Sequence, residues 1–375
     1  EIYPLSLHDA LPIWFHMDLF SAKDFSAHEQ VVFASDPQTG LKAIIAIHNT
    51  ARGPALGGCR MWAYGSEDEA VTDALRLSKG MSYKSALADL PLGGGKSVII
   101  GDSRKDKTPE LMRAMGRAVD RLSGRYIVAE DVGTSTADMT QIRTNTKFVA
   151  GLAPEQGGSG DPSPATAWGC FLGIKQAVQF HLKQDDLRGL RVAIQGLGNV
   201  GQHLCHLLHE AGAKLIVTDI RPEYVQKMVE AYGATAVLPE AIYGVGADVF
   251  APCALGAVIN DVTTMQLKVK IVAGSANNQL AEARHGQVLL DKGILYAPDY
   301  AINAGGVINV GYEQILGPGN YNRDKAYAHI GRIAQTMQII FEMAAQKGIP
   351  TNLAADQLAE LRLVAPDSNL TRLKA

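Results

Sequence analysis

Short apolar runs and one long amphipathic stretch organise the first part of the chain. Runs at 31–34 and 41–47 are separated by turn residues and predict a strand, a turn and a second strand. From Ser66 onward the apolar spacing becomes helical, and runs at 97–100 and 126–129 predict further strands. This region is therefore expected to form a mixed α/β domain.

A polar, glycine-rich break at 157–162 separates that region from a second pattern. Ser163 and Pro164 follow the break and indicate a helix start, with Ser163 as the N-cap. Four short apolar runs come next, with helical stretches between the early ones, at 191–195, 214–218, 248–251 and 270–273. Strands that alternate with helices favour a parallel sheet.

The end of the chain carries a further helical stripe of apolar residues, at positions 330, 333, 337, 340 and 344. It predicts one helix that packs back on the first domain. We expect an α/β protein with a catalytic, substrate-binding and oligomerisation domain, a Rossmann-type doubly wound nucleotide-binding domain, and a C-terminal helical segment, at 17–150, 151–325 and 326–375.

Residues 1–16 have neither a basic start nor a long apolar run, so they do not resemble a secretory signal. We interpret them as a leader that is not part of the native protein, with Met17 as the start. A family-specific N-terminal arm is the alternative.

Composition limits the classes of partner. A chain of 375 residues with 47% hydrophobic content can bury two cores. Its net charge of −3 gives no electrostatic reason to expect a nucleic acid or an anionic membrane, and no run approaches the roughly 20 apolar residues of a membrane helix. Four well-separated cysteines without a Cys-x-x-Cys pair indicate reduced thiols in a cytoplasm, and no metal site is predicted.

A glycine-rich turn predicts a dinucleotide site. Gly196-Leu-Gly198-Asn199-Val200-Gly201 follows an apolar strand and opens an amphipathic helix, which places backbone N–H groups where a pyrophosphate binds. Gly198 would let the phosphate approach closely. A lone glycine turn in a doubly wound domain is the alternative interpretation.

The second strand of this domain ends at Asp219, where a carboxylate accepts hydrogen bonds from the adenosine ribose. That position favours NAD. Arg221 weakens the preference, because an arginine there suits the 2′-phosphate of NADP.

Lys84 and Lys96 both lie in apolar, glycine-rich surroundings, although lysines prefer solvated faces. If both enter one cleft, repulsion and desolvation lower the pKa of at least one, which then serves as a neutral base while its partner holds a carboxylate. Gly95-Lys96-Ser97 does not fit a phosphate-binding loop, because Leu90 replaces its first glycine and a strand follows. We expect the glycines at 93–95 to let substrate approach the backbone; a tight turn with a surface lysine is the alternative.

Two polar segments follow strands and extend the candidate site. Asp131 comes after the strand at 126–129 and is a candidate for proton transfer, or else a loop acid that caps the next turn. The amides of Asn277 and Asn278 follow the strand at 270–273 and are placed to contact nicotinamide or its ribose, with simple turn formation as the alternative.

Together these segments resemble the glutamate, leucine, phenylalanine and valine dehydrogenase superfamily, most closely its leucine branch. The resemblance runs from about residue 41 to about residue 312. Its motifs occur in order as Gly53-Pro-Ala-Leu-Gly-Gly58, Gly80-Met-Ser-Tyr-Lys84, Leu92-Gly-Gly-Gly-Lys96, Ala129-Glu-Asp-Val-Gly133, Gly196-Leu-Gly-Asn-Val-Gly201, Ser275-Ala-Asn-Asn278 and Asn303-Ala-Gly-Gly-Val307.

The resemblance implies a reaction and the residues that perform it. Lys84 would bind the substrate α-carboxylate, Lys96 would activate the water that attacks the imino carbon, and Asp131 would move protons at nitrogen. Hydride would pass from Cα to the nicotinamide while the two domains close over the substrate. Further contacts would come from Thr166 and Asn277 at the nicotinamide, Asp219 at the ribose, and Gly57, Gly58 and Asn278 at the substrate.

One departure within the superfamily indicates the substrate. Leu56 stands where glutamate-active members are expected to carry a lysine, so a distal carboxylate would be buried unpaired at a high cost. Leu56, Val307 and Val310 would form an aliphatic pocket instead. We expect reversible oxidative deamination of leucine, valine and isoleucine to 2-oxo acids and ammonia, in a homo-oligomer that is commonly an octamer in this branch.

Three other activities remain in view. Phenylalanine is the alternative substrate, because the Gly93-Gly-Gly-Lys96 run also occurs in phenylalanine-active relatives. A non-catalytic NAD-binding regulator would not need both lysines and Asp131. A 2-hydroxy-acid dehydrogenase would require a histidine base and a carboxylate-binding arginine, and no such motif is visible.

Overall fold

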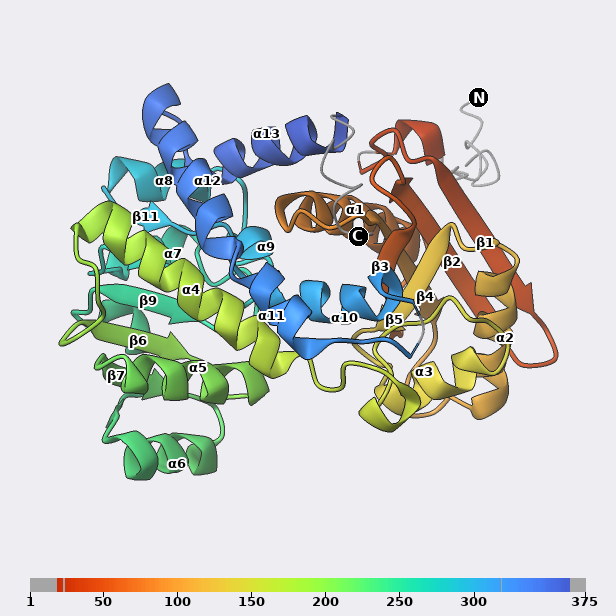
Figure 1. Cartoon of the computed structure of the whole chain (residues 1–375), viewed down its shortest axis with the longest axis horizontal. Helices are drawn as coiled ribbons and strands as arrows, with labels where there is room; N and C mark the ends of the chain where they lie inside the picture. The colour runs from red at the N-terminus through yellow and green to blue at the C-terminus, as the bar shows by residue number, and fades with distance from the viewer. Residues whose placement is uncertain (1–18, 23, 318, 365–375) are drawn as a thin grey trace, which may run out of the picture.

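The computed structural model describes residues 19–22, 24–317 and 319–364. The leader expected at 1–16 and the last residues of the C-terminal segment lie outside the described residues. The described chain forms two α/β domains, each built on its own sheet, with helices α1, α10 and α13 between them (Figure 1). Among the described helices, none combines the length and the apolar character that a membrane crossing requires.

The first sheet has five strands in the order β1-β2-β4-β3-β5. β1 and β2 form the expected antiparallel hairpin, whereas β4, β3 and β5 run parallel to one another. β3 was not predicted, because Pro54 and the pair Gly57 and Gly58 interrupt its apolar pattern. The strands are β1 (Gln30–Asp36), β2 (Leu41–Asn49), β3 (Ala55–Trp62), β4 (Gly93–Ile100) and β5 (Tyr126–Glu130).

Helices cover both faces of this sheet, because successive strand residues point to opposite sides. Ile44 and Ala46 of β2 pack with α1 (Glu67–Leu87), while Ile45 and Ile47 pack with α2 (Pro109–Asp120). α3 (Thr136–Arg143) lies beside α2. As predicted, α1 begins after Ser66, whose side chain accepts a hydrogen bond from the backbone of Glu69.

The glycines at 93–95 lie against other parts of the first domain, and Gly94 brings α1 and β4 into close contact. A Cβ on Gly94 would overlap the backbone nitrogen of Ser82 in α1, and a Cβ on Gly95 would lie 2.8 Å from the ring of Tyr126. The expectation that these glycines open the backbone to substrate is therefore wrong: protein atoms already fill the space. The close contact instead places Lys84 and Lys96, each two residues further along, at one end of the α1–β4 pair.

The second sheet has six parallel strands in the order β11-β10-β9-β6-β7-β8. The chain starts at β6, adds β7 and β8 on one side, and then crosses over to add β9, β10 and β11 on the other. This is the strand order of a dinucleotide-binding domain, whose ligand lies where the direction reverses. The strands are β6 (Arg191–Gln195), β7 (Lys214–Thr218), β8 (Thr235–Ala236), β9 (Val249–Pro252), β10 (Ile271–Val272) and β11 (Leu295–Tyr296).

Helices flank this sheet as expected for a doubly wound domain. α4 begins at Ser163 itself, with Pro162 at the N-cap and the Asp161 side chain accepting from the Ser163 backbone, so the predicted cap is displaced by one residue. The helices up to β11 are α4 (Ser163–Leu182), α5 (Asn199–Glu210), α6 (Pro222–Tyr232), α7 (Asp261–Gln266) and α8 (His285–Asp291).

The C-terminal stripe is buried as predicted but belongs to two helices, since the chain bends at Gly331. α12 packs mainly on α4 of the second domain, and α13 packs on α1, so α13 makes the return to the first domain. The helices are α9 (Asp299–Ile302), α10 (Gly305–Ile315), α11 (Arg323–Ile330), α12 (Ile333–Lys347) and α13 (Thr351–Val364), and short 3-10 turns lie at Leu19–Ser21, Pro154–Gln156 and Ile242–Gly244.

The contact at Gly94 generates a stability prediction. Gly94→Ala forces α1 away from β4, and such overpacking costs about 1–3 kcal/mol. Gly80→Ala is the control on the other side of the contact, in helix α1, because its Cβ would meet nothing within 4 Å. It should stabilise the helix by about 0.5–1 kcal/mol. Denaturant unfolding measures both; equal stability of the two variants would contradict the packing role of Gly94.

Candidate active site

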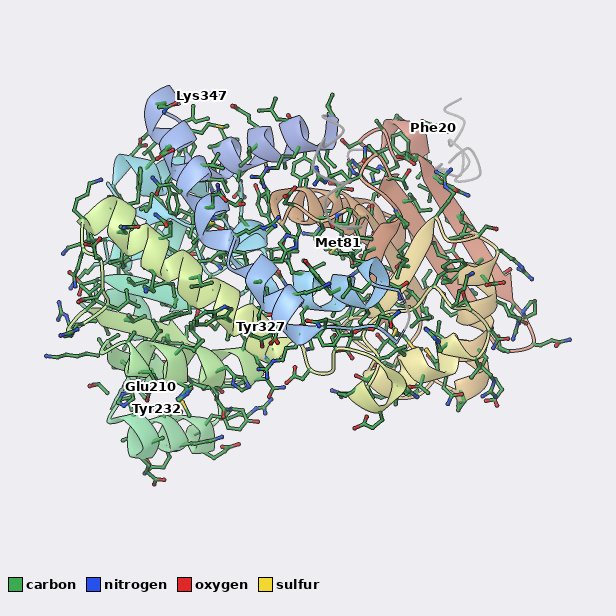
Figure 2. All side chains as sticks on the ribbon, in the orientation of Figure 1. Phe20, Met81, Glu210, Tyr232, Tyr327 and Lys347 are labelled. Atoms are coloured by element: carbon green, nitrogen blue, oxygen red, sulfur yellow. The ribbon has the colours of Figure 1, made fainter. Side chains whose placement is uncertain are left out.

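A cavity of about 360 Å³ lies where the two domains meet. Met81 of α1 lines it and is seen between the two sheets, near the middle of the molecule (Figure 2). Many residues predicted for catalysis, substrate binding and cofactor binding line it together: Leu56, Gly57, Gly58, Lys84, Lys96, Asp131, Thr166, Val200, Asn277, Val307 and Val310.

Lys96 and Asp131 are in direct contact within this cavity. Lys96 projects from β4 and is 4% exposed, and its Nζ forms an ion pair with Oδ2 of Asp131. Asp131 follows β5, and Thr134 accepts a hydrogen bond from its backbone. A Cβ on Gly58 would lie 2.8 Å from Cβ of Asp131, so the glycine leaves room for the carboxylate. The pair can therefore exchange a proton directly.

Burial lowers the pKa of Lys96 to about 7, and repulsion from the Arg60 guanidinium adds to this shift. Arg60 projects from β3 and lies 3.6 Å from Asp131 and 2.8 Å from Asp73. A neutral amine at Lys96 is therefore accessible near neutral pH. Sequence reasoning missed Arg60, although a charged residue inside the apolar run 55–62 was a usable signal.

Lys84 extends from α1 into the same space. Its Nζ donates to Oδ1 of Asn277 at 3.2 Å, and Nδ2 of Asn303 donates to the same oxygen at 2.7 Å. Burial lowers the pKa of Lys84 to about 8, while the negative charge of Asp299 opposes the shift. Lys84 thus keeps its proton more readily than Lys96, as a carboxylate-binding cation must.

The causes of these two shifts differ in part from the prediction. Desolvation is the largest cause for both lysines, as expected. Repulsion on Lys96 comes first from Arg60, with a smaller contribution from Lys84. Asp299 was also missed; it is buried between α9 and the 277–279 turn, and Gln279 donates its backbone N–H to it.

Part of the cavity lining is aliphatic. Leu56 of β3 is 1% exposed, and Val307 and Val310 of α10 form part of the same wall. The first domain contributes Leu56 to this wall, and the second domain contributes Val307 and Val310. Asn278 lies elsewhere, in an adjoining cavity of about 340 Å³ that shares Lys84, Lys96 and Asp131 with the first.

The glycine-rich segment at 196–201 lies between β6 and the start of α5, and its Val200 lines the cavity. Helix α5 begins at Asn199 without a side-chain cap at Gly198, and a Cβ on Gly198 would meet nothing within 4 Å. A Cβ on Gly201 would overlap the carbonyl oxygen of Gly196, so Gly201 lets the helix lie against the strand end. The open helix N-terminus fits a pyrophosphate.

Asp219 lies just after β7 and stabilises this turn through hydrogen bonds. Its carboxylate accepts from the backbone of Leu197 at 2.6 Å and of Arg221 at 2.9 Å. Arg221 donates to the hydroxyl of Tyr224 at 2.7 Å and stacks on its ring. Its guanidinium is thus already engaged within the described structure.

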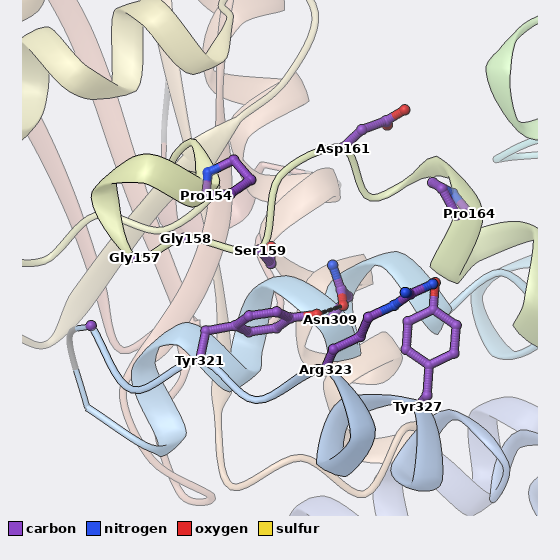
Figure 3. A pocket seen from close by; sticks show the side chains of 11 residues that line it. Pro154, Gly157, Gly158, Ser159, Asp161, Pro164, Asn309, Tyr321, Arg323 and Tyr327 are labelled. Carbon is purple, nitrogen blue, oxygen red and sulfur yellow. Dashed lines mark hydrogen bonds between the residues drawn. The ribbon is translucent and has the colours of Figure 1, made fainter.

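A separate cavity of about 550 Å³ lies beside α10 (Figure 3). Asn309 and Tyr321 are hydrogen-bonded there, and Arg323 stacks over Tyr327. It contains none of the predicted site residues. The predicted lysines and Asp131 therefore lie in the interdomain cavity and not in this one.

Known proteins are similar to this chain over most of its length. Residues 28–148 match the family domain "Glu/Leu/Phe/Val dehydrogenase, dimerisation domain", and 157–221 with 217–364 match "Glutamate/Leucine/Phenylalanine/Valine dehydrogenase". A leucine dehydrogenase of Geobacillus stearothermophilus is 56% identical over 92% of this chain and 94% of its own. A phenylalanine dehydrogenase of Caldalkalibacillus thermarum is 51% identical over the same shares of the two chains.

A solved structure is similar to this one in fold and in sequence. The crystal structure of L-tryptophan dehydrogenase from Nostoc punctiforme matches with a TM-score of 0.81 and 46% identity, over 92% of this chain and 97% of that one. Both family domains, in the order found here, and relatives aligned over nearly the whole chain show that this protein belongs to the glutamate/leucine/phenylalanine/valine dehydrogenase family.

Proposed function

We propose that this protein catalyses the NAD-dependent, reversible oxidative deamination of leucine, valine and isoleucine to 2-oxo acids and ammonia. One observation carries the proposal: a single cavity is lined by Lys84, Lys96 and Asp131 together with the aliphatic residues Leu56, Val307 and Val310. The two leucine dehydrogenases of Geobacillus stearothermophilus and Bacillus cereus, at 56% and 54% identity, support the choice of leucine.

The three polar residues have complementary roles in this reaction. Protonated Lys84 binds the α-carboxylate and fixes Cα in the cavity. Asp131 accepts a proton from the substrate nitrogen, which leaves an imine once the Cα hydride has departed. Neutral Lys96 then takes a proton from water as its oxygen attacks the imino carbon. Asp131 then donates its proton to nitrogen, and the Lys96–Asp131 contact passes the proton on Lys96 to Asp131. Neutral Lys96 takes the hydroxyl proton of the intermediate as the C–N bond breaks, which leaves the carbonyl group of the 2-oxo acid and ammonia.

The nucleotide end fits NAD, which supplies the acceptor for the Cα hydride. The open position at Gly198 and the N-terminus of α5 would receive the pyrophosphate. Asp219 would receive the ribose hydroxyls, and Thr166 and Asn277 the nicotinamide end. Gly196, Asn199, Val200 and Gly201 complete the cofactor set, and Gly57, Gly58 and Asn278 complete the substrate set.

The aliphatic wall accounts for the proposed substrate class. A glutamate side chain would place its carboxylate against Leu56, Val307 and Val310, and an unpaired buried charge is costly. Leucine and valine fill the same space with apolar groups. One methylene changes affinity by about 1–3 kcal/mol, so these substrates should differ only modestly.

We further assign 17–150 to catalysis and assembly, 151–325 to NAD binding and 326–375 to the C-terminal segment. The family description of 28–148 as a dimerisation domain supports a homo-oligomer, and we propose an octamer. The four cysteines are unpaired, which supports a cytoplasmic location.

A substrate panel tests the proposed reaction. Purified protein with NAD should generate nicotinamide absorbance with leucine, valine and isoleucine, and none with glutamate, because only aliphatic side chains suit the wall at Leu56. The 2-oxo acids with ammonia should reverse the change. Phenylalanine as the best substrate would overturn the branched-chain assignment, and NAD binding without any turnover would favour a non-catalytic regulator.

Lys96→Ala tests the assigned base. Loss of general base catalysis should lower kcat by about 10²–10⁴-fold. NAD affinity, measured by calorimetry, should stay unchanged because the glycine-rich turn is not altered. Lys105→Ala removes an exposed lysine and should behave as the unchanged protein. Turnover retained in Lys96→Ala would exclude this role.

Arg60→Gln tests the charge state of Lys96 through the pH profile. With the pKa of Lys96 at about 7, kcat/KM for leucine should fall below about pH 7, where the amine is protonated. Removing the Arg60 charge favours protonated Lys96, which raises its pKa and moves the falling limb to higher pH. Arg76→Gln also removes a partner of Asp73 and should leave the limb in place. An identical profile in both variants would refute the coupling.

A further inference from the structure

A buried carboxylate joins α10 to the segment between the two domains. Glu313 of α10 is 3% exposed. Its Oε2 accepts from the backbone of Gly151 at 3.0 Å and of Leu152 at 3.4 Å. Its Oε1 accepts from the backbone of Ser159 at 2.8 Å and from the Ser159 hydroxyl at 2.6 Å. One side chain therefore gathers four donors from both ends of a stretch of nine residues, 151–159.

The chemistry of these contacts requires two acceptor oxygens. The three backbone N–H groups can only donate, so they suit a carboxylate and not an amide. Burial raises the pKa of Glu313, and the hydrogen bonds from Ser159, Leu152 and Gly151 act against that rise. Hydrogen bonds to an ionised acceptor are roughly twice as strong as neutral ones. The four contacts thus form a firm attachment.

The attachment lies between the two halves of the substrate wall. Gly151 lines the cavity, and Val310 lies on α10 three residues before Glu313, about one helical turn. Gln314 reinforces the attachment by donating to the carbonyl oxygen of Val149 at 2.8 Å. Figure 3 shows Ser159 on the connecting segment facing α10 near Asn309.

Backbone hydrogen bonds continue from this attachment to the other wall. The backbone of Ala150 donates to Val128 of β5 at 2.8 Å. β5 pairs with β3, where Leu56 lies opposite Ile127. The separation of Leu56 from Val310 is thus set through β3, β5, the connecting segment and Glu313, in that order.

We propose that Glu313 is a positioning residue that fixes the width of the side-chain pocket and thereby selects substrates by size without touching them. The inference rests on the proposed function. In Glu313→Gln, an NH₂ group replaces one acceptor and faces donors, so α10 moves away from the connecting segment. The wider pocket then holds a branched aliphatic side chain loosely and accepts a larger one.

Steady-state kinetics test this inference. In Glu313→Gln, loss of two buried hydrogen bonds should raise KM for leucine about tenfold. The ratio of kcat/KM for leucine to kcat/KM for phenylalanine should fall about fivefold or more, because leucine loses its close fit in the wider pocket and phenylalanine does not. Neither kcat nor the NAD dissociation constant should change more than about twofold, because Lys96, Asp131 and the glycine-rich turn are untouched. Glu230→Gln, on the exposed face of α6, is the control for loss of one carboxylate.

A milder variant guards against misfolding. Ser159→Ala removes the hydroxyl donor and keeps the backbone donor. KM for leucine should therefore rise, as in Glu313→Gln, but only about threefold. The inference is overturned if Glu313→Gln matches the control, if leucine and phenylalanine change equally, or if NAD affinity falls in parallel with kcat. If Glu313→Gln does not fold, an unchanged KM in Ser159→Ala overturns it.

Hydrogen exchange separates this inference from the proposed function. The amides of Gly151, Leu152 and Ser159 should be protected in the unaltered protein and exchange faster in Glu313→Gln, whether or not any amino acid is turned over. An unaltered protein that is silent on the whole substrate panel would refute the proposed function alone. Equal exchange in the two proteins would refute the attachment itself.

Discussion

The close approach of α1 to β4 at Gly94 determines the geometry of the reaction site. A helix normally lies about 10 Å from a sheet because side chains separate the two backbones. At Gly94 there is no side chain, and the backbone of Ser82 occupies that space. The lysines that follow, Lys84 on the helix and Lys96 on the strand, are consequently held near each other in a poorly hydrated cavity. The lowered pKa values of the two lysines follow from their burial in this cavity.

Two amines of the same type acquire different charge states through their neighbours. Lys96 meets the cationic Arg60 as well as the carboxylate of Asp131, whereas Lys84 lies within the field of Asp299 and donates to Asn277. Burial lowers both pKa values, and the surrounding charges separate them. A base and a carboxylate-binding cation can therefore operate side by side at one pH.

Local sequence patterns were sufficient for much of this structure. The dinucleotide strand, turn and helix, the hairpin of β1 and β2, and α1 after Ser66 all depend on neighbouring residues, and each was predicted. β3 was missed because Gly57 and Gly58 break its apolar run, and those glycines are required by contacts with distant strands. The bend at Gly331 also depends on tertiary packing, since α11 packs mainly on α10 and α12 packs mainly on α4.

Many of the predicted site residues line one cavity, while the charged groups around them were not predicted. Lys84, Lys96 and Asp131 carry motif signals that are visible along the chain. Asp299 and Glu313 do not, because their importance lies in what they face after folding, and Arg60 shows only as a charged residue within the stretch 55–62. The role of the glycines at 93–95 was also predicted wrongly. Small residues on a strand allow either a ligand or another part of the protein to approach the backbone, and only the packing of the folded chain distinguishes the two.

The substrate wall is divided between the domains, with Leu56 on one and Val307 and Val310 on the other. The three side chains to which we assign the chemistry, Lys84, Lys96 and Asp131, come from the first domain. Chemistry and selection are thus encoded largely in different stretches of the gene. Mutations in α10 can therefore change which amino-acid side chain the pocket prefers, while the residues assigned to acid–base chemistry stay the same. Specificity for one amino acid can thus evolve into specificity for another by changes in a single helix.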